Sequence, residues 1–321
     1  MDPSGFECER PAEAFRVWLL GGFRITVGSR TIPREAWSLR KAAALVKLLA
    51  LSRNRRLYRE QAMEALWPDS GRRAASNSLR STLHAARKVL DPDAGSLYLA
   101  SEDESLVLCP TGSLWVDVEA FEEAAAAARH ARNPAAYARA IELYSGQLLP
   151  EDRYEAWAEG RREELRAMYL DLLVEMAGLY EGRREWRPAI EALTRAVSEE
   201  PVLEEAHVGL MRLYAFSRRS GHALLQYERL RETLQRELGA EPDASVRALR
   251  EEIASGRFPP QEVQPLGSPS SEAEEPPQHN LPVPRTSFVD RQHELTEIKP
   301  TIAMTRLLTL TGVAQARPAS P

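Results

Sequence analysis

The chain has 321 residues, of which 43% are apolar and 28% charged, a balance typical of globular proteins and too apolar for disorder throughout. At about 100–200 residues per domain, this length predicts two domains and a fragment of a third. The net charge of −5 gives no sign of a nucleic-acid partner, but it is unevenly distributed. Residues 30–88 carry fourteen Lys and Arg against four Asp and Glu, a net +10, so the other residues sum to −15. A basic block joined to an acidic remainder indicates two parts with different tasks.

Residues 15–112 predict a winged helix-turn-helix domain, after a disordered N-terminus at residues 1–14. Residues 15–32 alternate apolar and polar side chains around two glycine turns, which is typical of a small antiparallel meander. Helical periodicity follows at 39–52 and again at 59–67, where Pro68 ends the second helix. A third helix is predicted from a cap at Asp69 or Ser70 to about Leu90, and residues 97–109 return to strand character as a hairpin.

Residues 113–255 are rich in Ala, Leu, Glu and Arg and predict an all-helical domain. Leu179-Tyr180 recurs as Leu213-Tyr214, and Ala189 recurs as Ala223, each at a spacing of 34 residues. Thirty-four residues is the period of tetratricopeptide repeats, in which helix pairs stack. The predicted fold class is therefore mainly α with a small β component. Residues 256–287 hold eight prolines and predict an extended linker, followed by a poorly ordered segment at 288–321.

The third predicted helix is the candidate site. One face presents Leu79, Leu83, Ala86 and Leu90 for packing. The other face carries Asn77, Arg80, Ser81, His84, Arg87 and Lys88, and the helix begins with Arg72 and Arg73. Arg and Asn can read guanine and adenine edges, whereas Ser, Arg and Lys can hold phosphates, which also favour a helix N-terminus. We interpret this face as a DNA-reading surface whose affinity depends strongly on salt.

A basic helix face is more often simply solvated, and only its position inside the basic block of a winged helix favours DNA contact. For His84 alone, capping or packing is an equally open role. Carboxylate pairs elsewhere are interpreted as solvated, and four tryptophans are interpreted as packing anchors: Trp67, Trp115, Trp157 and Trp186.

Other kinds of site are not predicted. Cys8 and Cys109 are far apart and form no CxxC pair, so neither a disulfide scaffold nor a cysteine zinc site is expected. The histidines lack HExxH or HxxxH spacing, and GxSxG is absent; we predict no catalytic residue, metal or cofactor, and no enzyme. The acidic N-terminus and the lack of a long apolar run predict no signal peptide, no membrane partner and a cytoplasmic protein.

Several segments of the N-terminal region resemble one bacterial family: LLGGFRITVGSRTI, RKAAALVKLLAL, EALWPDSGRRAASNSLRSTLHAARKVLD and GSLWVDVEAFEEA. Together they look like the start of the SARP/AfsR-type activators, which have an OmpR-type winged helix. The stretch AIELYSGQLLPEDRYEAWAEGRREELR is similar to their tetratricopeptide-like bacterial transcriptional activator domain. The resemblance covers about residues 15–255. It implies a regulator that binds promoter DNA, often at direct repeats and as more than one copy, and that helps to recruit RNA polymerase.

The sequence departs from this family at two places. The hairpin tip carries Glu102, Asp103 and Glu104, whose charge opposes contact with phosphate, so a polymerase contact and plain exposure are both open. The segment from His279 to Val313 resembles the lead-in to the nucleotide-binding domain of large AfsR-like regulators, but residues 312–317 read GVAQAR and form no P-loop. We therefore predict no nucleotide binding, in a relative truncated before the ATPase P-loop.

The leading hypothesis is a sequence-specific DNA-binding transcription regulator, an activator by resemblance. Its expected partners are double-stranded promoter DNA, RNA polymerase and a second copy of the chain on DNA. The alternative from another class is a protein-interaction scaffold of tetratricopeptide type, whose basic winged-helix surface is not used on DNA. An ATP-gated switch is a weaker third hypothesis.

Overall fold

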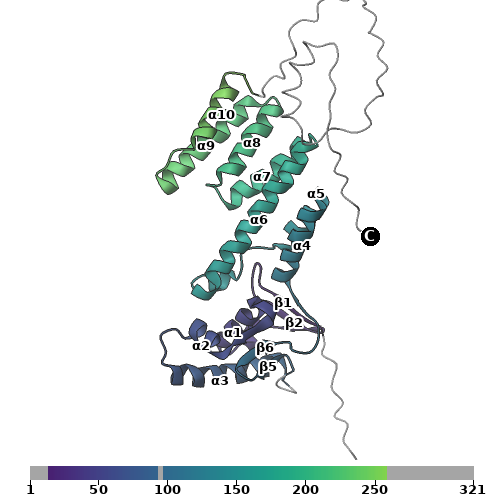
Figure 1. Cartoon of the computed structure of the whole chain (residues 1–321), viewed down its shortest axis with the longest axis vertical. Coiled ribbons are helices and arrows are strands. Elements are labelled where there is room, and N and C mark those ends of the chain that lie inside the picture. The colour runs from purple at the N-terminus through teal and green to yellow at the C-terminus, as the bar shows by residue number, and fades with distance from the viewer. Residues whose placement is uncertain (1–13, 93–96, 259–321) are drawn as a thin grey trace, which may run out of the picture. The chain divides into compact units, whose positions relative to one another are not determined.

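The computed structural model describes residues 14–92 and 97–258, and it is mainly helical with two small sheets (Figure 1). Apart from residues 14 and 256–258, the predicted N-terminal tail, the proline-rich linker and the segment 288–321 lie outside the described residues. No helix in the described ranges has both the length and the apolar character needed to cross a membrane.

The first sheet is the predicted meander with one strand added. Strands β1 (Phe15–Trp18), β2 (Arg24–Val27) and β3 (Arg30–Ile32) pair antiparallel in register. A fourth strand, β7 (Leu114–Val116), pairs parallel with β1, so the sheet order is β3-β2-β1-β7. The sequence did not predict β7, because three residues are too few to display a period of two.

Three helices and a second sheet complete the winged helix. Helices α1 (Arg40–Leu51), α2 (Arg59–Leu66) and α3 (Arg72–Leu90) lie close to the predicted positions. The second sheet has the order β4-β6-β5, where β5 (Leu99–Glu102) and β6 (Ser105–Leu108) form the predicted hairpin and β4 (Arg56–Tyr58) was not predicted. Two short 3₁₀ turns lie at Arg34–Ala36 and Arg53–Arg55.

The predicted cap of α3 is wrong. Gly71 is the N-cap residue, and no side chain caps the helix there. Asp69 and Ser70 belong instead to the turn after α2, where the Ser70 N–H donates to the Trp67 carbonyl at 3.1 Å. Glycine is tolerated at an N-cap almost as well as the usual capping residues, so the helix starts two positions later than Ser70 without a side-chain cap.

Seven helices follow, in keeping with the predicted helical domain. They are α4 (Asp117–Ala131), α5 (Pro134–Leu143), α6 (Ala156–Gly182), α7 (Trp186–Glu199), α8 (Glu204–Phe216), α9 (Ser220–Leu238) and α10 (Ala244–Ala254). A 3₁₀ turn, η3 (Pro150–Asp152), lies between α5 and α6. The Asn133 side chain accepts from the Ala136 N–H at 3.0 Å and caps α5.

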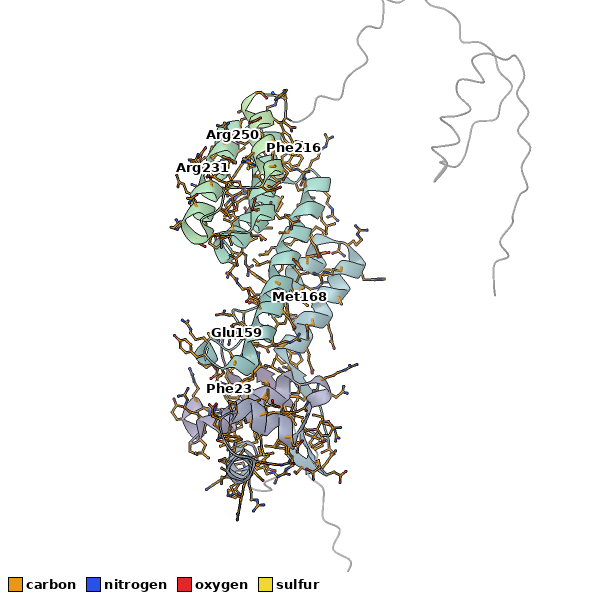
Figure 2. The ribbon with its side chains drawn as sticks, turned by 60° about the vertical axis from the view of Figure 1, so that its left-hand side comes forward. Phe23, Glu159, Met168, Phe216, Arg231 and Arg250 are labelled. Atoms are coloured by element: carbon orange, nitrogen blue, oxygen red, sulfur yellow. The ribbon has the colours of Figure 1, made fainter. Side chains whose placement is uncertain are left out.

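The 34-residue repeat is present as a repeated turn between paired helices. Arg184, between α6 and α7, has φ 58°, and Arg218, between α8 and α9, has φ 57°. In both turns the next residue donates its N–H to a tyrosine carbonyl, Glu185 to Tyr180 at 2.9 Å and Arg219 to Tyr214 at 2.8 Å. Between the two pairs, Trp186 stacks on Phe216, which is labelled in Figure 2, with ring centroids 5.5 Å apart. The helix pairs therefore stack as the sequence period predicted.

Candidate nucleic-acid interface

Helix α3 has the two faces that its sequence predicts. Leu79, Leu83, Ala86 and Leu90 are all buried, at 5% exposure or less, and they join the core shared with α1. The opposite face therefore points away from the core. The helical period alone fixes where this polar face points, because a helix that packs through one apolar stripe must expose its remaining side chains to solvent.

Most of the predicted polar residues on this face are exposed and unengaged. Arg73, Asn77, Arg80, His84 and Lys88 are exposed, and their side chains form no hydrogen bond or ion pair with any other described residue. This placement removes packing and capping as roles for His84. Ser81 is also exposed, and its hydroxyl donates to the Asn77 carbonyl at 3.3 Å within the helix. The face offers donors that are available to an external ligand.

Two of the predicted residues are already engaged in the free chain. The Arg87 Nε–H donates to the Leu99 carbonyl at 2.8 Å, so this half-buried side chain braces the hairpin against α3. Arg72 forms an ion pair with Glu60 of α2, with both side chains well exposed. Exposed ion pairs contribute little to the stability of the fold. Arg72 can therefore leave Glu60 and bind a phosphate with only a small loss of free energy.

The structure reduces the effective charge of the basic block. Lys41, Lys47, Arg55 and Arg56 each form an ion pair with an acidic residue from outside residues 30–88. Arg30 donates to the Leu90 carbonyl at 2.6 Å and thereby satisfies the C-terminal end of α3. The net +10 of the sequence therefore overstates the charge that can release counterions from DNA, because several of its cations serve the fold.

The acidic hairpin tip is partly neutralised from within its own sheet. Glu102 pairs with Arg56 of β4, and the Arg59 guanidinium donates to the Ser101 hydroxyl at 2.7 Å. Asp103 makes the turn at φ 50°. The side chains of Asp103 and Glu104 form no ion pair with a described residue. That this tip does not grip the phosphate backbone stays a prediction.

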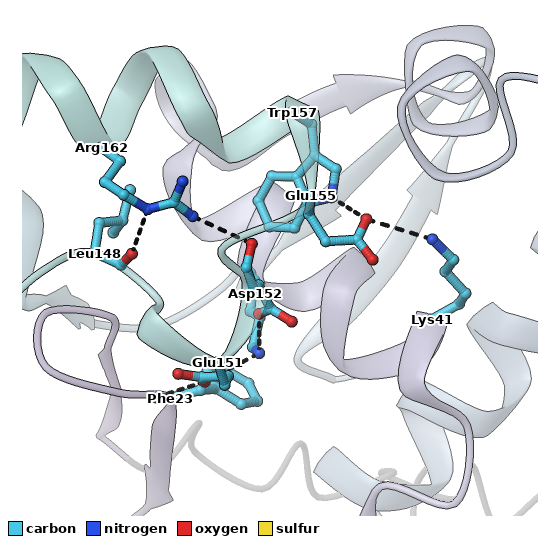
Figure 3. Close-up of polar contacts among 9 residues, drawn as sticks. Phe23, Lys41, Leu148, Glu151, Asp152, Glu155, Trp157 and Arg162 are labelled. Carbon is cyan, nitrogen blue, oxygen red and sulfur yellow. Dashed lines mark hydrogen bonds and ion pairs between the residues drawn. The ribbon is translucent and has the colours of Figure 1, made fainter.

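The string GQLLPEDRYEAW holds the helical part to the winged helix (Figure 3). Lys47 of α1, almost fully buried, forms ion pairs with Glu151 and Asp152 of η3 and lies over the Phe23 ring, 4.5 Å from its centroid. The Phe23 N–H donates to Glu151 at 2.9 Å. Sequence reasoning missed this junction, although a lysine amid the apolar residues of α1 was a visible signal.

Further contacts fix the same junction from the helical side. The Arg162 guanidinium donates to the Leu148 carbonyl at 3.0 Å and to the Asp152 carbonyl at 3.2 Å (Figure 3). Lys41 pairs with Glu155, which also accepts from the Trp157 indole N–H at 2.9 Å. Together these bonds hold the loop from α5 to α6 against α1 and the β1–β2 turn.

Asp117, the first residue of α4, is the most buried acid of this junction. Its carboxylate accepts from the Leu19 and Leu20 backbone N–H groups, each at 2.9 Å. Burial raises the pKa of Asp117 to about 6, and these two N–H groups offset only part of that rise. The β1–β2 connection and α4 are thus joined by a carboxyl group that titrates near neutral pH.

The prediction for Trp115 requires a correction. Trp67, Trp157 and Trp186 pack against the hydrophobic core as predicted. Trp115 does not, because it lies on the outer face of the first sheet, edge-on to Trp18, with ring centroids 5.3 Å apart. In β7 the two neighbours of Trp115 are buried, so the strand alternation turns this side chain outward.

These elements define a class of protein, a winged helix with an exposed basic third helix fused to stacked helix pairs. Residues 116–254 match the family described as the bacterial transcriptional activator domain. The transcriptional regulatory proteins EmbR of Mycobacterium bovis and Mycobacterium tuberculosis are 30% identical over 252 residues, which cover 73% of this chain and 62% of theirs. The chain therefore spans less than two thirds of the length of these curated relatives.

The solved structure of Mycobacterium tuberculosis EmbR in complex with a low affinity phosphopeptide has the same fold, with a TM-score of 0.63. At 23% identity it covers 75% of this chain and 65% of the other, and this likeness shows the fold alone. Domain match, relatives and fold agree with the resemblance drawn from the sequence. The chain is similar to the SARP-type bacterial transcriptional regulators, and its residues 116–254 match the bacterial transcriptional activator domain.

Proposed function

We propose that the protein is a sequence-specific DNA-binding transcription regulator that reads promoter DNA with α3 and activates transcription. One observation carries the proposal: α3 buries its apolar stripe and leaves five polar residues exposed and without a side-chain partner in the described part of the chain, namely Arg73, Asn77, Arg80, His84 and Lys88. A polar helix face held on a rigid core is the form in which winged helices enter the major groove.

The eight residues assigned to DNA differ in the work each can do. Arg80 and Asn77, in the first half of α3, have the side chains that fork onto guanine and adenine. Arg72, Arg73 and Lys88 lie near the ends of the helix, where phosphate contacts set its register on the duplex. Ser81 and His84 complete the face, and Arg87 contributes from the edge while it braces the hairpin.

The helical part supplies protein contacts in this proposal. Stacked helix pairs form extended surfaces suited to protein partners, and we assign to them RNA polymerase and a second copy of the chain on DNA. The junction around Lys47 fixes these surfaces relative to α3. A partner held by the helical part would therefore be placed at a defined position on the promoter.

The decisive experiment selects duplexes from a random DNA pool with the full chain and then titrates the enriched duplex in a mobility-shift assay. We expect Arg80→Ala to weaken specific binding by about 1–3 kcal/mol, roughly five- to 150-fold. Arg139→Ala is the matched control, because Arg139 is exposed on α5 and has no partner among the described residues.

Salt dependence separates base reading from phosphate contact. If Arg80 touches only phosphate, its loss weakens all sequences alike and flattens the slope of log affinity against log salt by about one unit. No enrichment of any duplex, together with no retention on random DNA at low salt, would favour the protein-interaction scaffold instead.

A further inference from the structure

The open face of the first sheet carries a second cluster of aromatic and basic side chains. In β1 and β2 (Figure 1), Phe15, Val17, Ile25 and Val27 point into the core. Strand alternation therefore turns their neighbours to the other face. The cluster on that face consists of Arg16, Trp18, Arg24 and Trp115, and it is called the Trp/Arg face below.

Strand register brings these four residues together. Trp18 lies opposite Arg24, and Arg16 lies next to Trp115 across the parallel pair. The Arg24 guanidinium carbon lies 4.0 Å from the centroid of the Trp18 ring, and the Trp18 and Trp115 rings meet at 61°. Both tryptophans are partly exposed, and neither belongs to a hydrophobic core cluster. Two large aromatic rings thus remain on the surface.

The charged side chains of this face are all basic. The four strands of the sheet contain no Asp or Glu. Arg16 and Arg24 are exposed, and neither forms an ion pair with a carboxylate of any described residue. By contrast, Lys41, Lys47, Arg55 and Arg56 of the same domain all have carboxylate partners within the chain. Among residues 14–92 and 97–258, the Trp/Arg face therefore has no carboxylate partner.

We propose that the Trp/Arg face binds an acidic segment of a partner protein, one that places an apolar side chain beside its carboxylates. Trp and Arg dominate the energetically important residues of protein interfaces. A guanidinium stacked on an indole keeps its in-plane N–H groups available, and these match a carboxylate in two parallel hydrogen bonds. The edges of Trp18 and Trp115 offer contact area to the apolar side chain.

Nucleic acid fits this face less well. Single strands bind by stacking bases on open aromatic rings, whereas Arg24 covers one face of Trp18 and Trp115 meets its ring edge-on. The Trp/Arg face lies on β1, β2 and β7, whereas the proposed DNA-reading face lies on α3, so the two faces belong to different elements. The inference therefore does not depend on the DNA-reading proposal.

The test screens a library of random 16-residue peptides on the immobilised full chain and on an Arg16→Ala/Arg24→Ala variant. We expect peptides rich in Asp and Glu, with at least one large apolar residue, to be enriched on the unaltered chain alone. In titration, the most enriched peptide should bind Arg24→Glu at least tenfold more weakly. Arg139→Glu is the matched control and should bind within twofold of the unaltered chain.

Three results would overturn the inference. The first is an absence of acidic peptides among those enriched, or equal enrichment on the double variant with its circular dichroism unchanged. The second is displacement of the peptide by a 16-nucleotide oligo-dT, or loss of duplex binding in the double variant, since either would make the face a nucleic-acid surface. The third is self-association of the chain that Arg24→Glu abolishes, which would make a second copy the occupant.

Discussion

Asp117 allows the sharpest test at the scale of a single residue. Burial raises the pKa of its carboxyl from 3.8 to about 6 in the folded chain. The folded state therefore keeps this proton at a pH where the unfolded state has lost it, and the stability that the proton confers disappears as pH rises through 6. Between pH 4.5 and pH 7, the free energy of unfolding of the unaltered chain should fall by about 1–2 kcal/mol relative to Asp117→Asn.

Urea denaturation of both proteins at the two pH values measures this difference, because the contributions of all other groups cancel. Asp69→Asn, which removes an exposed acid from the turn after α2, serves as the matched control. A difference of the opposite sign would mean that the Leu19 and Leu20 N–H groups outweigh burial and hold the carboxylate charged.

The sequence predicted whether a side chain is buried or exposed where the period of one helix determines this. The period of 3.6 residues was sufficient to separate Leu79 and Leu83 from Asn77 and Arg80. It could not show that Arg87 is committed to the Leu99 carbonyl or Arg72 to Glu60, because both partners belong to other elements. Side-chain pairings between elements depend on tertiary packing, which the local pattern of a single sequence does not predict.

At the scale of elements, the repeated turns of the helix pairs carry a measurable strain. Arg184 and Arg218 adopt left-handed backbone conformations that a side chain disfavours and glycine accepts. Arg184→Gly should therefore raise the free energy of unfolding by about 0.5–1 kcal/mol. This is a net value, because glycine relieves the backbone strain of the turn but also increases the conformational entropy of the unfolded chain.

The neighbouring Arg183, with φ −92°, is the matched control in the same turn. Arg183→Gly relieves no backbone strain, so it should leave the stability unchanged or lower it by up to about 1 kcal/mol. Thermal unfolding of both variants compares the two positions directly. Equal effects at 183 and 184 would show that the backbone at 184 is not strained.

Elements were predictable where a sustained period, or a turn between neighbouring strands, marks them in the sequence. The long helices α1 and α3 and the hairpin β5–β6 show a clear period and lie close to the predicted residues. Strands β4 and β7 have three residues each and pair with strands more than forty residues away, so no local pattern marks them. Trp115 was misjudged for the same reason, since its outward position depends on β7 being a strand.

At the scale of the whole chain, the sequence separated a basic part from an acidic part but treated their charges as independent. The structure joins them, because α1, β4 and the 3₁₀ turn Arg53–Arg55 of the winged helix direct cations to acids of η3, the hairpin and α4. Part of the charge asymmetry therefore holds the protein together. The DNA surface in our proposal is the smaller set of cations on α3 that this network leaves unpaired.

Lys47 tests whether the junction holds the molecule together through charge. Its ammonium group is almost fully buried between Glu151 and Asp152, themselves mostly buried. Lys47→Met keeps most of the volume but leaves two carboxylates without their cation, so we expect a loss of about 2–4 kcal/mol in urea denaturation. Lys88→Met alters an exposed lysine of α3 that has no ion-pair partner among the residues the structure describes, and it should change stability by less than about 0.5 kcal/mol. If Lys47→Met were equally harmless, apolar packing alone would hold the winged helix to the helices that follow it.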